Sequence, residues 1–416
     1  MLLKFKVSNY GSICDLQEFS MLCGSTRTKP DHIAEVENIR VLKNTVMYGP
    51  NAAGKSKFIS AIETSQAIIL SSMTSQPDIR KSYCRVNPEN RKAESYFEYI
   101  FSVGKRFYSY GFEAVLNDLR IDSEWLIELD TQLQEKNLVF QREYGGNFEF
   151  GDVFDKDART RLDIYASDMQ NMQANTFLYE MNLKNLDGSE SLEVFRRIYS
   201  WFRNKLYVNH VKMPDKKSLY AAENVLKGLG LGITGIGFRE MSGEQVPFLS
   251  TAEYTGKTMN AGESTPDWAF FESVGDVTKA YELRIMHGNN IPFGIEEESA
   301  STLDVLRMVP LLTDEEDDVT VILDDYGDGL HPKLAYRFTE LIQRHNSRST
   351  RQFIACTHET ALMTLELFRR DEIWFMEKMG GISTMYSLEE FRERFDKVLQ
   401  KAYLEGRYGA LPVFSE

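Results

Sequence analysis

The sequence predicts an α/β protein with a parallel sheet at its centre, and three observations support this prediction. Residues 40–48 end in an apolar run typical of a buried strand, and residues 55–70 repeat apolar side chains at helical spacing. Between them, residues 49–56 fit the phosphate-binding pattern G-x-x-x-x-G-K-[ST]. Two more apolar strands, expected at residues 319–325 and 352–358, add to the same sheet.

The glycine-rich loop gives the chain its chemistry. Glycines let backbone N–H groups turn toward phosphates, and the following helix adds the partial positive charge of its N-terminus. We expect Lys55 to reach the β- and γ-phosphates of a nucleotide and Ser56 to hold Mg²⁺. The predicted nucleotide-binding residues of this loop are Gly49, Pro50, Asn51, Ala52, Ala53, Gly54, Lys55 and Ser56.

The remaining sequence suggests three lobes. Residues 1–150 should form an N-terminal lobe whose later part, with a tight hairpin turn at Gly104-Lys105, is an antiparallel β subdomain beside the nucleotide site. Residues 151–290 are expected to be a mainly helical insertion, with a linker-like stretch at 241–266. Residues 291–416 return to an α/β pattern and should complete the nucleotide-binding lobe.

The composition and charge of the chain argue against several classes of protein. The chain has 416 residues and a formal net charge of −14, which argues against generic coating of DNA and favours protein partners or a phosphorylated ligand. No apolar run approaches the ~18 residues of a membrane helix, and the N-terminus does not resemble a signal peptide. Scattered cysteines without a CxxC pair predict a reducing, cytoplasmic compartment and argue against a zinc site or a disulfide framework. These cysteines are Cys14, Cys23, Cys84 and Cys356.

Three residues in the C-terminal lobe supply what hydrolysis of a bound nucleotide requires. Such a site needs a carboxylate near Mg²⁺, a group that positions water and a contact to the γ-phosphate. Asp324, at the end of an apolar strand, suits the metal, and Asp325 suits the water-activating position. His358, at the end of the next strand, suits a γ-phosphate sensor, although a lone histidine is also commonly structural.

Together these motifs resemble those of ABC-type ATPase heads related to the SMC, RecF and overcoming-lysogenisation (OLD) ATPases. The similarity is greater to the RloA-type "AAA family ATPase" proteins of prokaryotic defence islands. It covers both ends of the chain, whereas residues 155–290 are far less diagnostic. Besides the Walker A loop, the motifs that carry it are the opening Asn9-Tyr10-Gly11-Ser12, the signature-like Glu298-Ser299-Ala300-Ser301-Thr302, the Walker B and D-loop segment 324–332, the histidine switch Thr357-His358, and the C-terminal segments 370–375 and 403–412.

The resemblance implies an ABC-type P-loop NTPase head with an antiparallel β subdomain and a helical insertion between its two halves. It implies an ATPase that uses ATP and Mg²⁺ and works as a homodimer or higher homo-oligomer. Two heads would enclose two nucleotides head to tail, so that Ser299, Ser301 and Thr302 of one copy face the Walker motifs of the other. ATP binding would close the dimer and hydrolysis would open it.

The resemblance also implies partners, because RloA-like proteins are typically encoded beside a second, often nuclease-like, protein in anti-phage systems. The chain would then sense a trigger, such as a phage-derived protein, and control that separately encoded effector. Nucleic acid stays open as a further partner, and no membrane is expected.

Two departures from the family pattern keep other functions open. Asp325 stands where a glutamate is usual and is one methylene shorter, and reaction geometry is sensitive to errors of about 1 Å. Ser301 stands where the family has glycine, so slow turnover is expected. One alternative is a non-hydrolysing scaffold that nucleotide stabilises and that sequesters an effector. The other is a DNA-repair head, against which the acidic charge and the lack of a long heptad-bearing coiled coil both count.

Overall fold

The computed structural model describes the whole chain except residues 77–78, 170–171, 242–267, 275–276, 392–397 and 413–416. The chain forms two compact units, each described here by itself. The first comprises Met1–His210, Glu316–Asp328 and Asn346–Glu416, and the second Val211–Glu315 and Gly329–His345. The boundaries between these units differ from the lobe boundaries expected at residues 150 and 290. The reason is that two C-terminal segments, Glu316–Asp328 and Asn346–Glu416, belong to the same unit as the N-terminal half.

A six-stranded sheet in the first unit contains the predicted parallel core. Its spatial order is β11 (Leu206–Val208), β16 (Thr320–Leu323), β17 (Gln352–Cys356), β5 (Asn44–Tyr48), β18 (Ile373–Met379) and β19 (Ile382–Ser387). All neighbours are parallel except β18 and β19. Every residue of β5 and β17 is buried, as expected for central strands of a parallel sheet. The α/β core predicted from the sequence is therefore confirmed.

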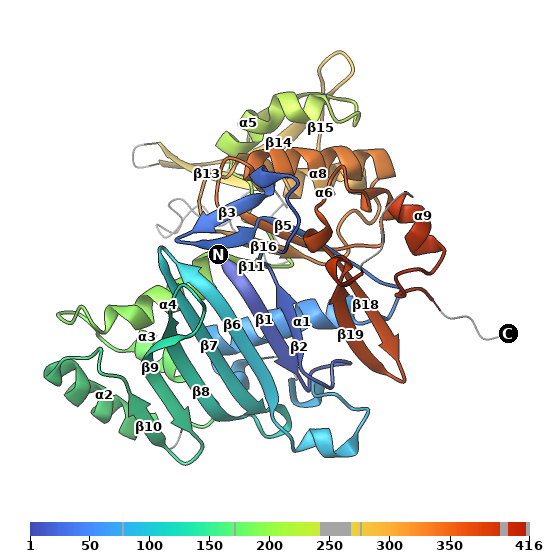
Figure 1. Cartoon of the computed structure of the whole chain (residues 1–416). Coiled ribbons are helices and arrows are strands. Elements are labelled where there is room, and N and C mark those ends of the chain that lie inside the picture. Colours follow the sequence, from blue (N-terminus) through green and yellow to red (C-terminus); the bar gives the residue numbers. More distant parts are fainter. Residues whose placement is uncertain (77–78, 170–171, 242–267, 275–276, 392–397, 413–416) are drawn as a thin grey trace. The chain divides into compact units, whose positions relative to one another are not determined.

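The antiparallel subdomain is also present, as a seven-stranded sheet at the lower left of Figure 1. The turn between its strands falls at Gly104 and Lys105 as predicted, since Val103 pairs with Arg106. A separate hairpin joins β3 (Ile33–Val36) to β4 (Ile39–Leu42). The spatial order of the large sheet is β10 (Asn147–Phe150), β9 (Glu135–Glu143), β8 (Arg120–Leu129), β7 (Arg106–Val115), β6 (Ser95–Val103), β1 (Leu2–Ser8) and β2 (Gln17–Ser20).

Helix α1 (Lys55–Leu70) begins and ends where the sequence predicts, and it packs on the antiparallel sheet. The ring of Phe58 lies 5.9 Å from that of Phe5 and 5.4 Å from that of Phe19. The Ser65 hydroxyl is 2.6 Å from the Tyr99 hydroxyl on β6. One hydrophobic core contains side chains of this helix and of both sheets. Burial of this apolar surface fixes the helix that carries the phosphate loop.

The buried carboxylate of Glu124 hydrogen-bonds a helix of the segment after residue 155 and so holds that segment to the antiparallel sheet. Glu124 on β8 is fully buried, and it accepts hydrogen bonds from the backbone N–H groups of Phe177 (2.6 Å) and Leu178 (3.1 Å). Arg142 donates to it at 2.8 Å. Its charge is thus satisfied by a cation and by the N-terminus of a helix. The helices of this region are α2 (Lys156–Asp168), α3 (Phe177–Leu183) and α4 (Glu193–Asn204).

The second unit corrects one expectation, because it is not mainly helical up to residue 290. It has helix α5 (Lys216–Lys227), but from Ile233 onward it forms a sheet of β12 (Ile233–Glu240), β14 (Val277–His287) and β13 (Ala269–Val274), with β15 (Ile291–Phe293) paired to β14. Nearly all of the linker expected at 241–266 lies outside the described residues. The remaining helices are α6 (Ala300–Arg307), α7 (Pro310–Thr313), α8 (Pro332–Asn346), and, in the first unit, α9 (Leu399–Leu404). None of the helices described here is long and apolar enough to cross a membrane.

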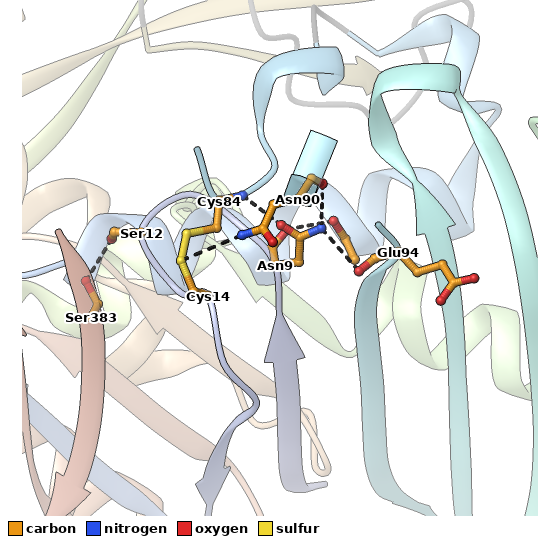
Figure 2. Close-up of a disulfide and its surroundings, with 8 residues drawn as sticks. Asn9, Ser12, Cys14, Cys84, Asn90, Glu94 and Ser383 are labelled. Atoms are coloured by element: carbon orange, nitrogen blue, oxygen red, sulfur yellow. Dashed lines mark hydrogen bonds between the residues drawn. A yellow bond between two sulfur atoms is a disulfide. The ribbon is translucent and has the colours of Figure 1, made fainter. Parts of the chain in front are cut away.

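A second correction concerns the cysteines. Cys14 and Cys84 form a disulfide with their Cα atoms 5.3 Å apart (Figure 2). The sequence argued against disulfides because the cysteines are scattered, but these two are brought together from 70 residues apart by the fold. Local spacing carries no information on such a pairing. Cys23 and Cys356 are free thiols.

Candidate nucleotide-binding site

Two glycines shape the phosphate loop that follows β5, because neither position has room for a side chain. A Cβ at Gly49 would lie 2.3 Å from the carbonyl oxygen of Met376. Gly54 has a φ of 115°, in the left-handed region, and a Cβ there would lie 2.3 Å from the Ser383 hydroxyl oxygen. Asn51 and Ala52, between them, are exposed. The loop is thus held close to β18 and β19 at both ends and open to solvent between them.

The Lys55 ammonium lies across this loop. Its Nζ donates to the carbonyl oxygen of Gly49 at 2.8 Å and to that of Pro50 at 3.2 Å. The same atom lies 3.0 Å from Nε2 of His358. The residue is only 4% exposed, and burial lowers the pKa of its amine. The loop therefore already holds a desolvated cation, which a phosphate oxygen could bind in place of the carbonyls.

The topology of the sheet brings the predicted catalytic residues together. Since β5, β17 and β16 are adjacent and parallel, their carboxyl ends lie at one edge, where α/β proteins commonly bind ligands. Lys55 comes after the end of β5, His358 after the end of β17, and Asp325 after the end of β16. Nε2 of His358 is 4.0 Å from Oδ1 of Asp325. Residues separated by up to about 300 positions thus form one cluster.

The two carboxylates after β16 differ in their backbone environment. The Asp324 backbone N–H donates to the side-chain oxygen of Asn209 at 3.0 Å, and the Asp325 N–H donates to the Asp324 carboxylate at 3.1 Å. Asp325 has a φ of 47°, a left-handed conformation uncommon for residues other than glycine, and its side chain is 58% exposed. Backbone strain of this kind is found disproportionately at functional sites.

A second set of hydrogen bonds fixes this turn to the end of β17. The Tyr326 N–H donates to the Cys356 carbonyl at 2.8 Å, and the Thr357 hydroxyl donates to the Tyr326 carbonyl at 2.6 Å. Thr357 is fully buried. The histidine and the two aspartates are therefore positioned by the same pair of strands.

The environment of His358 keeps its imidazole neutral. Burial lowers its pKa below the ordinary 6.5, and the Lys55 cation lowers it further, although Asp325 acts in the opposite direction. A neutral ring can accept the hydrogen bond from Lys55 through Nε2.

This arrangement makes a prediction for the protein without nucleotide. His358 should titrate below pH 6.5, so that the Lys55–His358 hydrogen bond is present at neutral pH and is lost as the pH falls through that pKa. Replacing Lys55 by alanine should raise the pKa, because a nearby cation disfavours imidazolium. NMR titration of the histidine ring signals measures this, with the signal assigned by its loss in His358→Gln. A pKa of 6.5 or more, or no response to Lys55→Ala, would contradict the arrangement.

The signature-like residues lie in the second unit, at the start of α6. The Ser299 hydroxyl caps this helix by accepting from the Thr302 N–H at 3.2 Å, and the two hydroxyl oxygens are 2.9 Å apart. Thr302 is buried. The Ser301 hydroxyl donates to the Gly329 carbonyl at 2.8 Å. Within this unit the side chain of Ser301 thus has a backbone partner.

Sequence analysis missed two polar residues that support the site, Asn209 and Ser383, and it named Ser12 only as part of the opening motif. Asn209 accepts a hydrogen bond from the backbone of Asp324, and Ser383 contacts both Ser12 and the phosphate loop. Ser383 is 1% exposed, and its hydroxyl donates to the Ala53 carbonyl at 2.6 Å. No local pattern marks Asn209 or Ser383, because their partners are distant in sequence.

Comparison with known proteins gives one family match. A family model described as "AAA domain, putative AbiEii toxin, Type IV TA system" matches residues 45–364, more than three quarters of the chain. No curated protein matches the sequence.

Three solved structures of SMC heads are similar to the chain. One is an SmcHead bound to the C-winged helix domain of ScpA, with 11% identity, 97% of this chain and 99% of that chain covered, and a TM-score of 0.45. The SMC head domain from Thermotoga maritima has 12% identity, coverages of 93% and 98%, and a TM-score of 0.39. An Smc head domain with an extended coiled coil, bound to the C-terminal domain of ScpA derived from Pyrococcus furiosus, has 11% identity, coverages of 98% and 98%, and a TM-score of 0.44.

Proposed function

The chain belongs to the AAA-domain family whose model spans residues 45–364, and from this premise we propose that it is an ATP-hydrolysing switch. The observation that carries the proposal is the cluster at the carboxyl edge of the parallel sheet. There the Lys55 ammonium is 3.0 Å from His358, which is 4.0 Å from the Asp325 carboxylate. A cation that can bind phosphate, a polar side chain that can contact the γ-phosphate and a carboxylate that can position water are common parts of sites that transfer phosphoryl groups to water.

The residues have distinct roles in this proposal. Lys55 leaves the carbonyls of Gly49 and Pro50 to bind the nucleotide phosphates, and His358 then turns its ring N–H to the γ-phosphate. Asp325, which is exposed, positions the attacking water. The loop residues Gly49 to Ser56 surround the phosphates with backbone N–H groups.

The donor set also fits Mg²⁺. Ser56 is exposed at the start of α1, and Asp324 is partly exposed with its carboxylate accepting one backbone N–H at 3.1 Å. Magnesium favours oxygen ligands and is commonly held by one or two protein groups together with substrate phosphates. Bound there, it would neutralise charge on the phosphates.

We further propose that two copies assemble head to tail. Ser299, Ser301 and Thr302 then complete the nucleotide site of the partner copy, and the dimer closes when ATP is bound. The helix N-terminus that Ser299 caps is suited to contact a phosphate. ATP occupancy would thereby control the shape of the assembly.

The biological setting we propose is prokaryotic anti-phage defence in the cytoplasm. The chain would sense a phage-derived trigger and control a separately encoded, nuclease-like effector. The family description supports this, because it names a toxin and a Type IV TA system. Two features of this chain also fit a switch better than a fast enzyme, namely the short carboxylate of Asp325 and its strained backbone.

The same two features favour a second candidate, a scaffold that nucleotide stabilises without turnover. If Asp325 cannot reach the attacking water, ATP would stay bound and would hold an effector inactive. This candidate needs the same loop and the same dimer, so it differs from the first only in phosphate release.

Steady-state phosphate release by the purified chain separates the two. We expect slow release that stops when Mg²⁺ is chelated, together with a shift from monomer to dimer in light scattering when ATP and Mg²⁺ are added. Dimerisation without release supports the scaffold. Neither release nor a nucleotide-dependent change of mass would show that the proposed function is wrong.

A further inference from the structure

The disulfide Cys14–Cys84 joins the turn that follows β1 to the segment after α1, and the proposed ATPase mechanism uses neither cysteine. Cys14 ends the turn that follows β1, and its carbonyl accepts from the Asn9 N–H at 3.1 Å. Cys84 is fully buried in the segment after α1, and its N–H donates to the Asn9 side chain at 3.0 Å. Figure 2 shows the bond between the two sulfur atoms, with Asn9 on one side and Ser12 on the other.

A short series of contacts leads from this disulfide to the nucleotide site. Two residues before Cys14, the Ser12 hydroxyl oxygen lies 2.8 Å from that of Ser383, and the Ser12 carbonyl accepts from the Ser383 N–H at 2.7 Å. The Ser383 hydroxyl in turn donates to the carbonyl of Ala53 in the phosphate loop. Gly54 has no room for a side chain, because Ser383 and Ser12 fill that space.

The same turn also contacts the helix that begins at the phosphate loop. The Tyr10 hydroxyl lies 2.7 Å from that of Thr64 and 2.9 Å from that of Ser60 on α1. The turn carrying Cys14 therefore touches the loop through Ser12 and the helix through Tyr10. These contacts connect the turn to the backbone that is to bind phosphate.

We propose that Cys14 and Cys84 form a thiol–disulfide exchange site that sets the nucleotide affinity of the phosphate loop. The disulfide holds the turn against Ser383 and keeps the loop ready for phosphate, and reduction frees the turn and weakens binding. The proposal rests on the nucleotide site proposed above. In a reducing compartment, disulfides are characteristically transient and redox-sensing, and this pair would tighten ATP binding under oxidative conditions.

The chemistry balances as an exchange with a small-molecule thiol or disulfide. In reduction, a dithiol's thiolate attacks the sulfur of Cys14, the more accessible of the two, and the Cys84 sulfur leaves and takes up a proton. The second thiol of the reductant then displaces Cys14, giving two protein thiols and an oxidised reductant. A disulfide such as oxidised glutathione reverses these steps.

The other two cysteines do not compete for this chemistry. Burial raises the pKa of the Cys23 thiol above its ordinary value, and it raises that of Cys356 well above it. Thiols that are not ionised are poor nucleophiles. Cys23 is also partly exposed, which makes Cys23→Ser the matched control for cysteine replacement.

The test measures binding of the slowly hydrolysed analogue ATPγS to the full chain by calorimetry, after oxidised glutathione or after dithiothreitol. Alkylation followed by mass spectrometry reports whether the pair is bonded in each sample. Reduction should weaken ATPγS binding about fivefold, which is the change in affinity expected from the loss of one net hydrogen bond. Cys23→Ser should behave like the unchanged protein. Cys14→Ser/Cys84→Ser should bind like the reduced protein under both conditions.

A second variant tests the connection without touching a cysteine. In Ser383→Ala the disulfide remains, but the contact between the Ser383 hydroxyl and the loop is lost. ATPγS binding should therefore be weak and insensitive to dithiothreitol. If the bond forms but affinity is the same in both states, or if alkylation finds the pair always reduced, the inference is wrong and the nucleotide site stands. If no form binds ATPγS, both the inference and the proposed function fail.

Discussion

Replacing Lys55 by alanine should weaken ATP binding about a hundredfold and reduce phosphate release below detection. The expected loss corresponds to hydrogen bonds made by a charged donor, each contributing about 1.5–3 kcal/mol. The structure strengthens this expectation, because the Lys55 ammonium is buried and already lies between the loop carbonyls and His358. Calorimetric titration with ATP and a phosphate-release assay measure the two effects.

The control for this variant is Lys105→Ala. This lysine lies in a hairpin turn, its side chain is 88% exposed, and its ammonium is 3.6 Å from the Glu37 carboxylate, a surface ion pair that contributes little to stability. Lys105→Ala should leave binding and turnover unchanged. Circular dichroism should show that both variants are folded, because Lys55 makes its contacts with carbonyl oxygens that water can satisfy. Undiminished ATP binding by folded Lys55→Ala would rule out the phosphate loop as the nucleotide site.

The parts of the fold that the sequence predicted correctly depend on local patterns. The strand, the glycine-rich loop and helix α1 (Lys55–Leu70) follow one another within about 30 residues, so periodicity and turn chemistry describe them completely. The hairpin at Gly104 and Lys105 is equally local. Lys55, Asp325 and His358 are predicted from equally local patterns, since each of them follows a short buried strand.

The parts that could not be predicted depend on contacts between distant segments. Nothing near residue 352 shows that β17 lies between β5 and β16, yet this order is what brings His358 to Lys55. The same holds for the Cys14–Cys84 disulfide and for Ser383 beneath the loop. Asn209, the residue that follows β11, accepts a hydrogen bond from the Asp324 backbone 115 residues later in the sequence. Single-sequence patterns carry no information on which segments meet.

Replacing Asp325 by asparagine should lower the rate of ATP hydrolysis about 10²- to 10⁴-fold, the usual contribution of a general base. Asparagine keeps the shape of the side chain but cannot accept a proton from water. ATP binding should be kept or strengthened, because the substitution removes a negative charge near the phosphates. Single-turnover and steady-state phosphate release give the rate, and calorimetry gives the affinity. Asp163→Asn, which changes a carboxylate 65% exposed on α2, is the matched control.

The backbone at this position favours aspartate over the longer glutamate that the sequence resemblance leads us to expect there, and it leads to a second substitution. With a φ of 47°, residue 325 is left-handed, a conformation that aspartate tolerates better than longer side chains do. Glutamate would gain one methylene of reach at the cost of about 1 kcal/mol of backbone strain. We therefore expect Asp325→Glu to raise turnover about tenfold while lowering the melting temperature, since misplacement by about 1 Å can cost a hundredfold in rate. If neither substitution alters phosphate release, Asp325 is not the water-activating residue, and another group must position the attacking water.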